Sequence, residues 1–183
     1  MTSMHTFAVY VEDRPGVLNR VASLFRRRGF NIHSLAVGPS ENAGISRMTA
    51  VVQTDAGGAL RISAHLYKLV HVISVEDITN RSSLVRDLAL IKVSADHFNR
   101  ASLLQLTQVF EARVVDVAAD SLVLEMTASP SRIDALLEVL RPYGVLEMAR
   151  TGRIAMLRGV SSELGAPGPT LEGEAQAGVS YSV

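Results

Sequence analysis

The chain of 183 residues contains no cysteine and no tryptophan. The absence of thiols excludes disulfides, thiolate catalysis and cysteine metal sites. Only 5% of the residues are aromatic, which disfavours proteins that stack bases or sugars on aromatic side chains. Basic and acidic residues number 18 each, so no net charge draws the chain to nucleic acid or to a membrane surface.

Long apolar runs are absent as well. No stretch of about 18 apolar residues could form a transmembrane helix, and residues 1–5 (MTSMH) are too polar to begin a signal peptide. With 48% hydrophobic residues the chain can nevertheless build a sizeable core. The sequence therefore predicts a soluble, cytoplasmic, globular protein of one domain or two small ones, with neither nucleic-acid nor membrane partners.

Common catalytic motifs are missing from the sequence. It contains no G-x-S-x-G, no H-E-x-x-H and no G-x-x-x-x-G-K-[ST]. The five histidines lack metal-ligand spacing, and the two acidic pairs at 12–13 and 76–77 consist of strand neighbours that point to opposite sides. We therefore predict no catalytic residue, no metal site and no cofactor on this chain.

Two periodicities alternate along the first half. Alternating apolar residues at 6–11 predict a strand, and apolar residues at helical spacing over 17–25 predict a helix that Gly29 ends. Strands are predicted at 31–38, 46–53 and 70–77, with a second helix before the last of them. This order, βαββαβ, is that of the ferredoxin-like fold. One apolar face of each helix is formed by Val17, Leu18, Val21, Leu24 and Phe25, and by Ala59, Ile62, Leu66, Leu69 and Val70.

The same order is predicted to repeat in the second half. A strand at 87–94 precedes a helix, strands at 113–117 and 122–127 follow, and Ser129 is expected to cap a helix that Pro130 opens. One or two strands are expected within 144–157. The predicted fold class is α+β, with two ferredoxin-like domains in tandem. The boundaries are an N-terminal domain at 1–78, a polar linker at 79–85, a C-terminal domain at 86–159 and a disordered tail at 160–183.

The candidate site is the turn between the first strand and the first helix. Free backbone N–H groups at a helix start attract a carboxylate or a phosphate. Gly16 either serves the turn or leaves space for a ligand, and Asp13 either caps the helix or receives a ligand ammonium. Asn31, after the helix, is either a turn residue or an amide that binds the ligand.

These residues carry a resemblance to a known family. Residues 12–21 (EDRPGVLNRV), with 24–25 (LF) and 28–32 (RGFNI), resemble an ACT domain. Together with 46–49 (SRMT), 86–93 (RDLALIKV) and Arg158-Gly159, they resemble the regulatory small subunit of acetolactate synthase, also called acetohydroxyacid synthase, over about residues 4–159. The chain departs from the family pattern at His33, His65 and Asp87.

The resemblance implies a non-catalytic subunit. It binds the catalytic large subunit, which uses thiamine diphosphate, magnesium and FAD, raises its activity and confers feedback inhibition by valine, or by leucine or isoleucine. Two ACT domains pair as a homodimer, and the effector lies between them. The effector-binding residues implied are Asp13, Arg14, Pro15, Gly16, Val17 and Leu18 of one chain and Asn31 and Ile32 of the partner chain, with Gly38 as a further contributor.

Two other functions remain open from the sequence. One is a free-standing ACT-domain amino-acid sensor with a different partner. The other is an RNA-binding ferredoxin-like module, which the zero net charge and the lack of aromatics in strand 46–53 disfavour.

Overall fold

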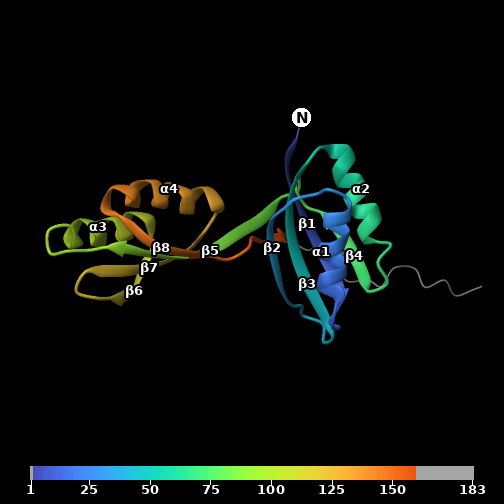
Figure 1. Cartoon of the computed structure of the whole chain (residues 1–183), viewed down its shortest axis with the longest axis horizontal. Helices are drawn as coiled ribbons and strands as arrows, with labels where there is room; N and C mark the ends of the chain where they lie inside the picture. Colours follow the sequence, from blue (N-terminus) through green and yellow to red (C-terminus); the bar gives the residue numbers. More distant parts are fainter. Residues whose placement is uncertain (1, 160–183) are drawn as a thin grey trace, which may run out of the picture.

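The computed structural model describes residues 2–159, so the tail expected at 160–183 lies outside the described residues. The described chain forms two α+β units that lie end to end (Figure 1). In each unit two helices cover one face of an antiparallel sheet.

The first unit confirms the predicted βαββαβ order. Its sheet has the strand order β2-β3-β1-β4, and β1 pairs with β3 along its whole length. The strand β2 is an edge strand, whose neighbour in the sheet is β3. The elements are β1 (Ser3–Glu12), α1 (Val17–Arg27), β2 (Ile32–Pro39), β3 (Ile45–Thr54), α2 (Ala56–Leu66) and β4 (Val72–Asp77).

Both faces of β1 are buried, for different reasons. Phe7 and Val9 belong to the core beneath α1 and α2. Because strand side chains alternate, Ala8 faces the other side, where it packs against Ile78 and Ala155. The sheet of the first unit is therefore covered by helices on one face and by the end of the described chain on the other.

The second helix is shorter than predicted. It ends at Leu66, and the backbone N–H groups of Lys68 and Leu69 bond three residues back, which tightens the chain into a turn. Val70 lies in this turn and is 77% exposed, so the prediction that it continues the apolar helix face and starts the strand is wrong.

The second unit repeats the order and adds one strand. Its main sheet has the order β6-β7-β5-β8, and β9 pairs with the beginning of β5. The side chain of Ser129 makes no capping bond. Its backbone carbonyl accepts from Arg132 and Ile133 instead, which corrects the expected side-chain cap. The elements are β5 (Ser83–Ser94), α3 (Arg100–Phe110), β6 (Arg113–Val117), β7 (Ser121–Ala128), α4 (Pro130–Leu140), the short 3-10 helix η1 (Arg141–Tyr143), β8 (Val145–Arg150) and β9 (Ile154–Leu157).

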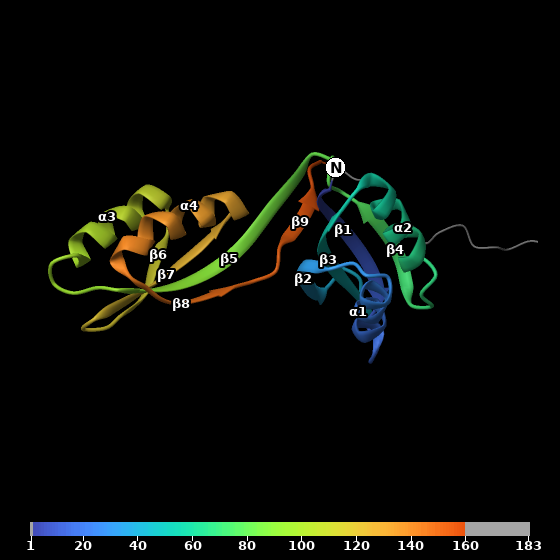
Figure 2. The same ribbon diagram turned by 45° about the horizontal axis from the view of Figure 1, so that its top comes forward.

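The strand β5 reaches from the second unit to the first. Residues 83–86 pair with β9, whereas residues 87–94 pair with β7 and β8. Figure 2 shows β9 beside β5 where this pair, here called the β5/β9 ribbon, reaches the first unit. Residues 83–85 of the expected linker 79–85 therefore lie in a strand, and Ala155 packs on the first unit.

A histidine–carboxylate pair closes the end of the first sheet. The Nδ1 atom of His5, which is 7% exposed, lies 2.8 Å from a carboxylate oxygen of Asp77. The backbone N–H and the hydroxyl of Thr79 both donate to the other carboxylate oxygen. Burial opposes ionisation, but the hydrogen bonds from Thr79 and His5 outweigh it and lower the pKa of Asp77 below its ordinary value.

We expect Asp77 to make stability depend on pH. A carboxylate that ionises more readily in the folded chain stabilises the fold above about pH 4, and this contribution is lost as the pH falls through the lowered pKa. The difference in unfolding free energy between the parent and Asp77→Asn should be constant near neutrality and shrink in acid. Urea unfolding from about pH 3 to pH 7 measures it.

The exposed Asp116 supplies the control for this experiment. Asp116→Asn should leave the pH profile of the parent unchanged. A difference between the parent and Asp77→Asn that does not vary with pH would contradict the expectation.

Candidate functional site

The turn between β1 and α1 is held by its backbone. The N–H of Asp13 donates to the carbonyl of Gly44 over 2.8 Å, and the N–H of Arg14 donates to the carbonyl of Glu12 over 2.9 Å. The guanidinium of Arg14 also pairs with the Glu12 carboxylate at 2.6 Å. The side chains of Asp13, Arg14 and Pro15 are exposed, so a ligand could reach them from solvent.

Gly16 is the N-cap of α1. Its φ of 84° lies in the left-handed region, which strains any residue with a Cβ atom. An added Cβ would meet nothing within 4 Å, so the space beside it is open. The two roles considered for this glycine are therefore compatible, because the turn needs its conformation and the surroundings leave room for a ligand.

The start of α1 is electrostatically suited to an anion. No side chain caps the helix, and no acidic residue lies in its first turn. Asp13 therefore does not take the capping role considered for it. Because the N-terminal end of a helix carries a partial positive charge, the first N–H groups of α1 favour a carboxylate.

The apolar residues predicted for the site differ in accessibility. Val17 is 4% exposed and belongs to the core of the first unit. Ile32 is half-buried and packs partly against the same core, whereas Leu18 is 44% exposed. Of these three residues, Leu18 is therefore the one whose side chain an apolar group can contact from solvent.

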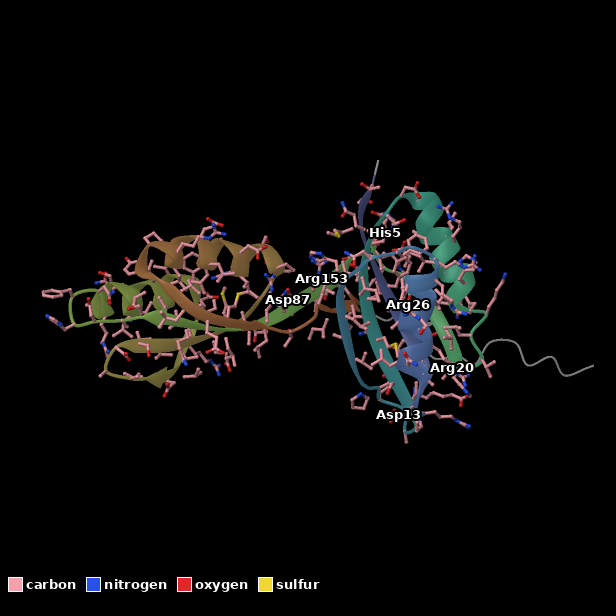
Figure 3. The ribbon with its side chains drawn as sticks, in the orientation of Figure 1. His5, Asp13, Arg20, Arg26, Asp87 and Arg153 are labelled. Atoms are coloured by element: carbon pink, nitrogen blue, oxygen red, sulfur yellow. The ribbon has the colours of Figure 1, made fainter. Side chains whose placement is uncertain are left out.

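One chain does not bring the two halves of the predicted site together. Figure 3 shows Asp13 and Arg26 near opposite ends of α1, and Asn31 and Ile32 follow the far end. Eleven residues of helix span about 16 Å. Asn31 and Ile32 are thus separated from the turn 13–18 of their own chain.

Gly38 lies at the same end of the sheet as the turn between β1 and α1. It pairs with Arg47, which in turn pairs with Tyr10 near the end of β1. Gly38 also lines an apolar pocket of about 420 Å³ formed with Thr49 and the β5/β9 ribbon. Thr49 pairs with Ala8, so this pocket lies on the sheet face opposite α1.

A contact that the sequence did not reveal joins β2 to the link between β8 and β9. The backbone N–H of Arg153 donates to the Ser34 hydroxyl over 2.7 Å. At Gly152 an added Cβ would lie 2.4 Å from the carbonyl oxygen of Leu35, so only glycine fits against this backbone. Gly152 lies in the polar stretch TGR, where a glycine is typical of any loop. Nothing in the sequence therefore indicated that it packs against Leu35.

Within residues 2–159, no group of three or more histidine or acidic side chains is arranged to hold a metal ion. None of the helices in this part of the chain is long and apolar enough to cross a membrane.

Comparison with known proteins decides the family. Residues 7–74 match the model of the AHAS small subunit-like ACT domain, and residues 86–159 match that of the small subunit of acetolactate synthase. A probable acetolactate synthase small subunit from Archaeoglobus fulgidus is 48% identical over 155 residues, which cover 85% of this chain and 97% of the relative. The chain belongs to the acetolactate synthase small-subunit family.

Two further members of this family are similar to the chain over most of its length. The acetolactate synthase small subunit of Mycolicibacterium smegmatis is 48% identical over 158 residues, covering 86% of this chain and 93% of the relative. The crystal structure of the acetolactate synthase small subunit from Thermotoga maritima superposes with a TM-score of 0.81 at 37% identity, covering 86% of this chain and 99% of that one. The resemblance stated from the sequence is confirmed, and the chain is a small regulatory subunit without catalytic function.

Proposed function

We propose that this chain binds the catalytic large subunit of acetolactate synthase in the cytoplasm, raises its activity and confers feedback inhibition by valine. Thiamine diphosphate, magnesium and FAD belong to the catalytic partner in this proposal. The observation that supports effector binding is the start of α1, where an open glycine turn and a helix end without a side-chain cap leave room for a small carboxylate.

The chemistry of the turn fits a branched zwitterion. The first N–H groups of α1 bind the valine carboxylate, as they would bind other small anions. The exposed Asp13 carboxylate or a main-chain carbonyl accepts from the ammonium group. The exposed Leu18 side chain contacts the isopropyl group, together with Ile32 of the partner subunit.

A homodimer through β2 completes the site. The outer edge of β2 has no strand beside it in residues 2–159, and unpaired edges readily pair with another strand. When two such edges pair antiparallel across a two-fold axis, the beginning of one β2 lies beside the end of the other. Asn31 of the partner subunit then approaches the turn 13–18, from which the length of α1 separates the chain's own Asn31.

The affinity of such a site is modest. Valine has about eight heavy atoms, and binding rarely exceeds about 1.5 kcal/mol per atom even for very small ligands. We therefore expect a dissociation constant between micromolar and millimolar. Feedback needs only a coupling of about 1–3 kcal/mol between the effector site and the catalytic subunit.

The test is acetolactate formation by the cognate catalytic subunit, with and without this chain, across a valine titration. Stimulation that valine reverses is the expected result. If only leucine or isoleucine reverses the stimulation, that amino acid is the effector in place of valine. The absence of any stimulation would overturn the proposal and favour a free-standing amino-acid sensor.

A further inference from the structure

A second, polar pocket lies where the two units meet. Its volume is about 370 Å³, and both units contribute to its wall. Figure 3 shows Asp87 and Arg153 between the units, far from Asp13. The side chains that matter here are His33, Ser34, Asp87, Arg150, Thr151 and Arg153.

One positive charge at this pocket is already neutralised. The guanidinium of Arg150 donates to Asp87 over 2.9 Å and to Asp134 over 2.7 Å. Burial acts against the charged form, but the hydrogen bonds to Asp134 and Asp87 raise the pKa of Arg150 above its ordinary value. Arg150 and its two carboxylates thus form a fixed wall with a surplus of one negative charge.

Two buried polar atoms at the pocket lack partners within residues 2–159. They are the Oδ1 atom of Asp87, whose side chain is only 8% exposed, and the Nε atom of Arg153. Folded proteins seldom leave such atoms unpaired, because burying them without a hydrogen bond costs free energy. The two atoms are complementary, since one accepts from a cationic donor and the other donates to an anion.

We propose that this pocket binds a small polar zwitterion, an α-amino acid with a polar side chain. Its ammonium group donates to Oδ1 of Asp87, and its carboxylate accepts from the guanidinium of Arg153. The Ser34 and Thr151 hydroxyls and the His33 ring provide hydrogen-bonding partners for the polar side chain.

The residues that line this pocket favour a polar amino acid over phosphate and over valine. An inorganic phosphate could accept from Arg153, but it has no cationic group for the unpaired oxygen of Asp87. Valine would place its isopropyl group among hydroxyl and charged groups, which offer little apolar contact. The pocket is therefore distinct in chemistry, as well as in position, from the turn at Gly16.

A ligand bound here also touches both units. His33 and Ser34 belong to β2, which also begins beside Asn31, whereas Asp87 and Arg150 belong to the second unit. Occupancy would therefore fix the arrangement of the two units by filling their junction.

The experiment is isothermal titration calorimetry on the full chain with serine, threonine, asparagine and glutamine, and with valine and phosphate for comparison. We expect at least one of the four polar amino acids to bind in the micromolar to millimolar range. Arg153→Gln should weaken that binding about tenfold or more, and Arg153→Lys, which keeps the charge, should weaken it less.

Two controls separate this proposal from the valine site. Arg158→Gln replaces an exposed arginine that does not line the pocket and should leave binding unchanged. Gly16→Asp should also leave it unchanged, even where that variant has lost its response to valine. Circular dichroism and thermal melts check that each variant is folded.

Three results would overturn the proposal. They are no binding of any of the four amino acids, binding that Arg153→Gln does not weaken, and binding of phosphate in their place. Loss of binding in Gly16→Asp but not in Arg153→Gln would assign the ligand to the turn instead.

Discussion

Gly16→Asp is expected to abolish valine inhibition while activation of the catalytic subunit survives. The new side chain enters open space, so it breaks no packing, and the left-handed conformation costs about 1 kcal/mol. The new carboxylate stands at the start of α1, where the valine carboxylate would bind, so it takes up part of that open space and repels the second negative charge. We expect the half-inhibiting valine concentration to rise about a hundredfold or more.

The measurement is the valine titration of acetolactate formation with the variant in place of the parent. Gly159→Asp is the matched control, because Gly159 also has a positive φ and open space but lies just after β9. It should keep valine sensitivity. Asn31→Ala should weaken inhibition in the same direction as Gly16→Asp. A fully valine-sensitive Gly16→Asp variant would show that the effector binds elsewhere.

Gly152→Ala is expected to destabilise the chain by about 3 kcal/mol. The added methyl group would lie 2.4 Å from the carbonyl oxygen of Leu35 and 2.6 Å from its carbonyl carbon. Both atoms are backbone atoms of β2, so they cannot rotate away. The link between β8 and β9 must therefore withdraw, which breaks the bond from Arg153 to Ser34 and disturbs the packing of Ala155.

Urea unfolding of the parent and of Gly152→Ala at neutral pH measures this loss of unfolding free energy. Gly57→Ala is the matched control, because the nearest atom to its added methyl group is the flexible end of Arg61 at 3.4 Å. In the first turn of α2 this change should be neutral or stabilise by up to about 1 kcal/mol. A Gly152→Ala variant as stable as the parent would mean that this link does not press on β2 in solution.

The sequence predicted the elements best where large apolar side chains recur at the period of a strand or a helix. Alternation at Phe7 and Val9, and helical spacing at Val21 and Leu24, arise because these side chains meet in one core. The same reasoning extended α2 too far. Val70 falls on the helical period, but the backbone has already tightened into a turn.

The junction between the units could not be predicted. The strand β9 has four residues, too few for a clear period, and its partners in β5 lie about seventy residues earlier in the chain. Residues 83–85 looked like a linker because the preceding segment is polar. Only the three-dimensional structure shows that the small side chains of Ala8 and Ala155 let the β5/β9 ribbon approach the sheet of the first unit.

The candidate site was predictable in part. Pro15 and Gly16 indicated the helix start, since proline and glycine directly before an apolar helical pattern are typical of a helix N-terminus. The burial of Val17 could not be inferred, because neighbouring Leu18 is equally apolar and only the rotation of α1 decides which of them faces the core. The contribution of Asn31 and Ile32 from a partner subunit stays a prediction.

The continuous strand β5 makes the molecule a lever. Twelve extended residues span about 40 Å, and hydrogen-bonded neighbours stiffen the strand at both ends. A tilt of about 5° where the ribbon rests on the first unit would therefore displace the far end by about 3.5 Å, by simple proportion along this length. Through this one strand, a small change in how the ribbon rests on the first unit would become a shift of several ångströms at the far end of the second unit.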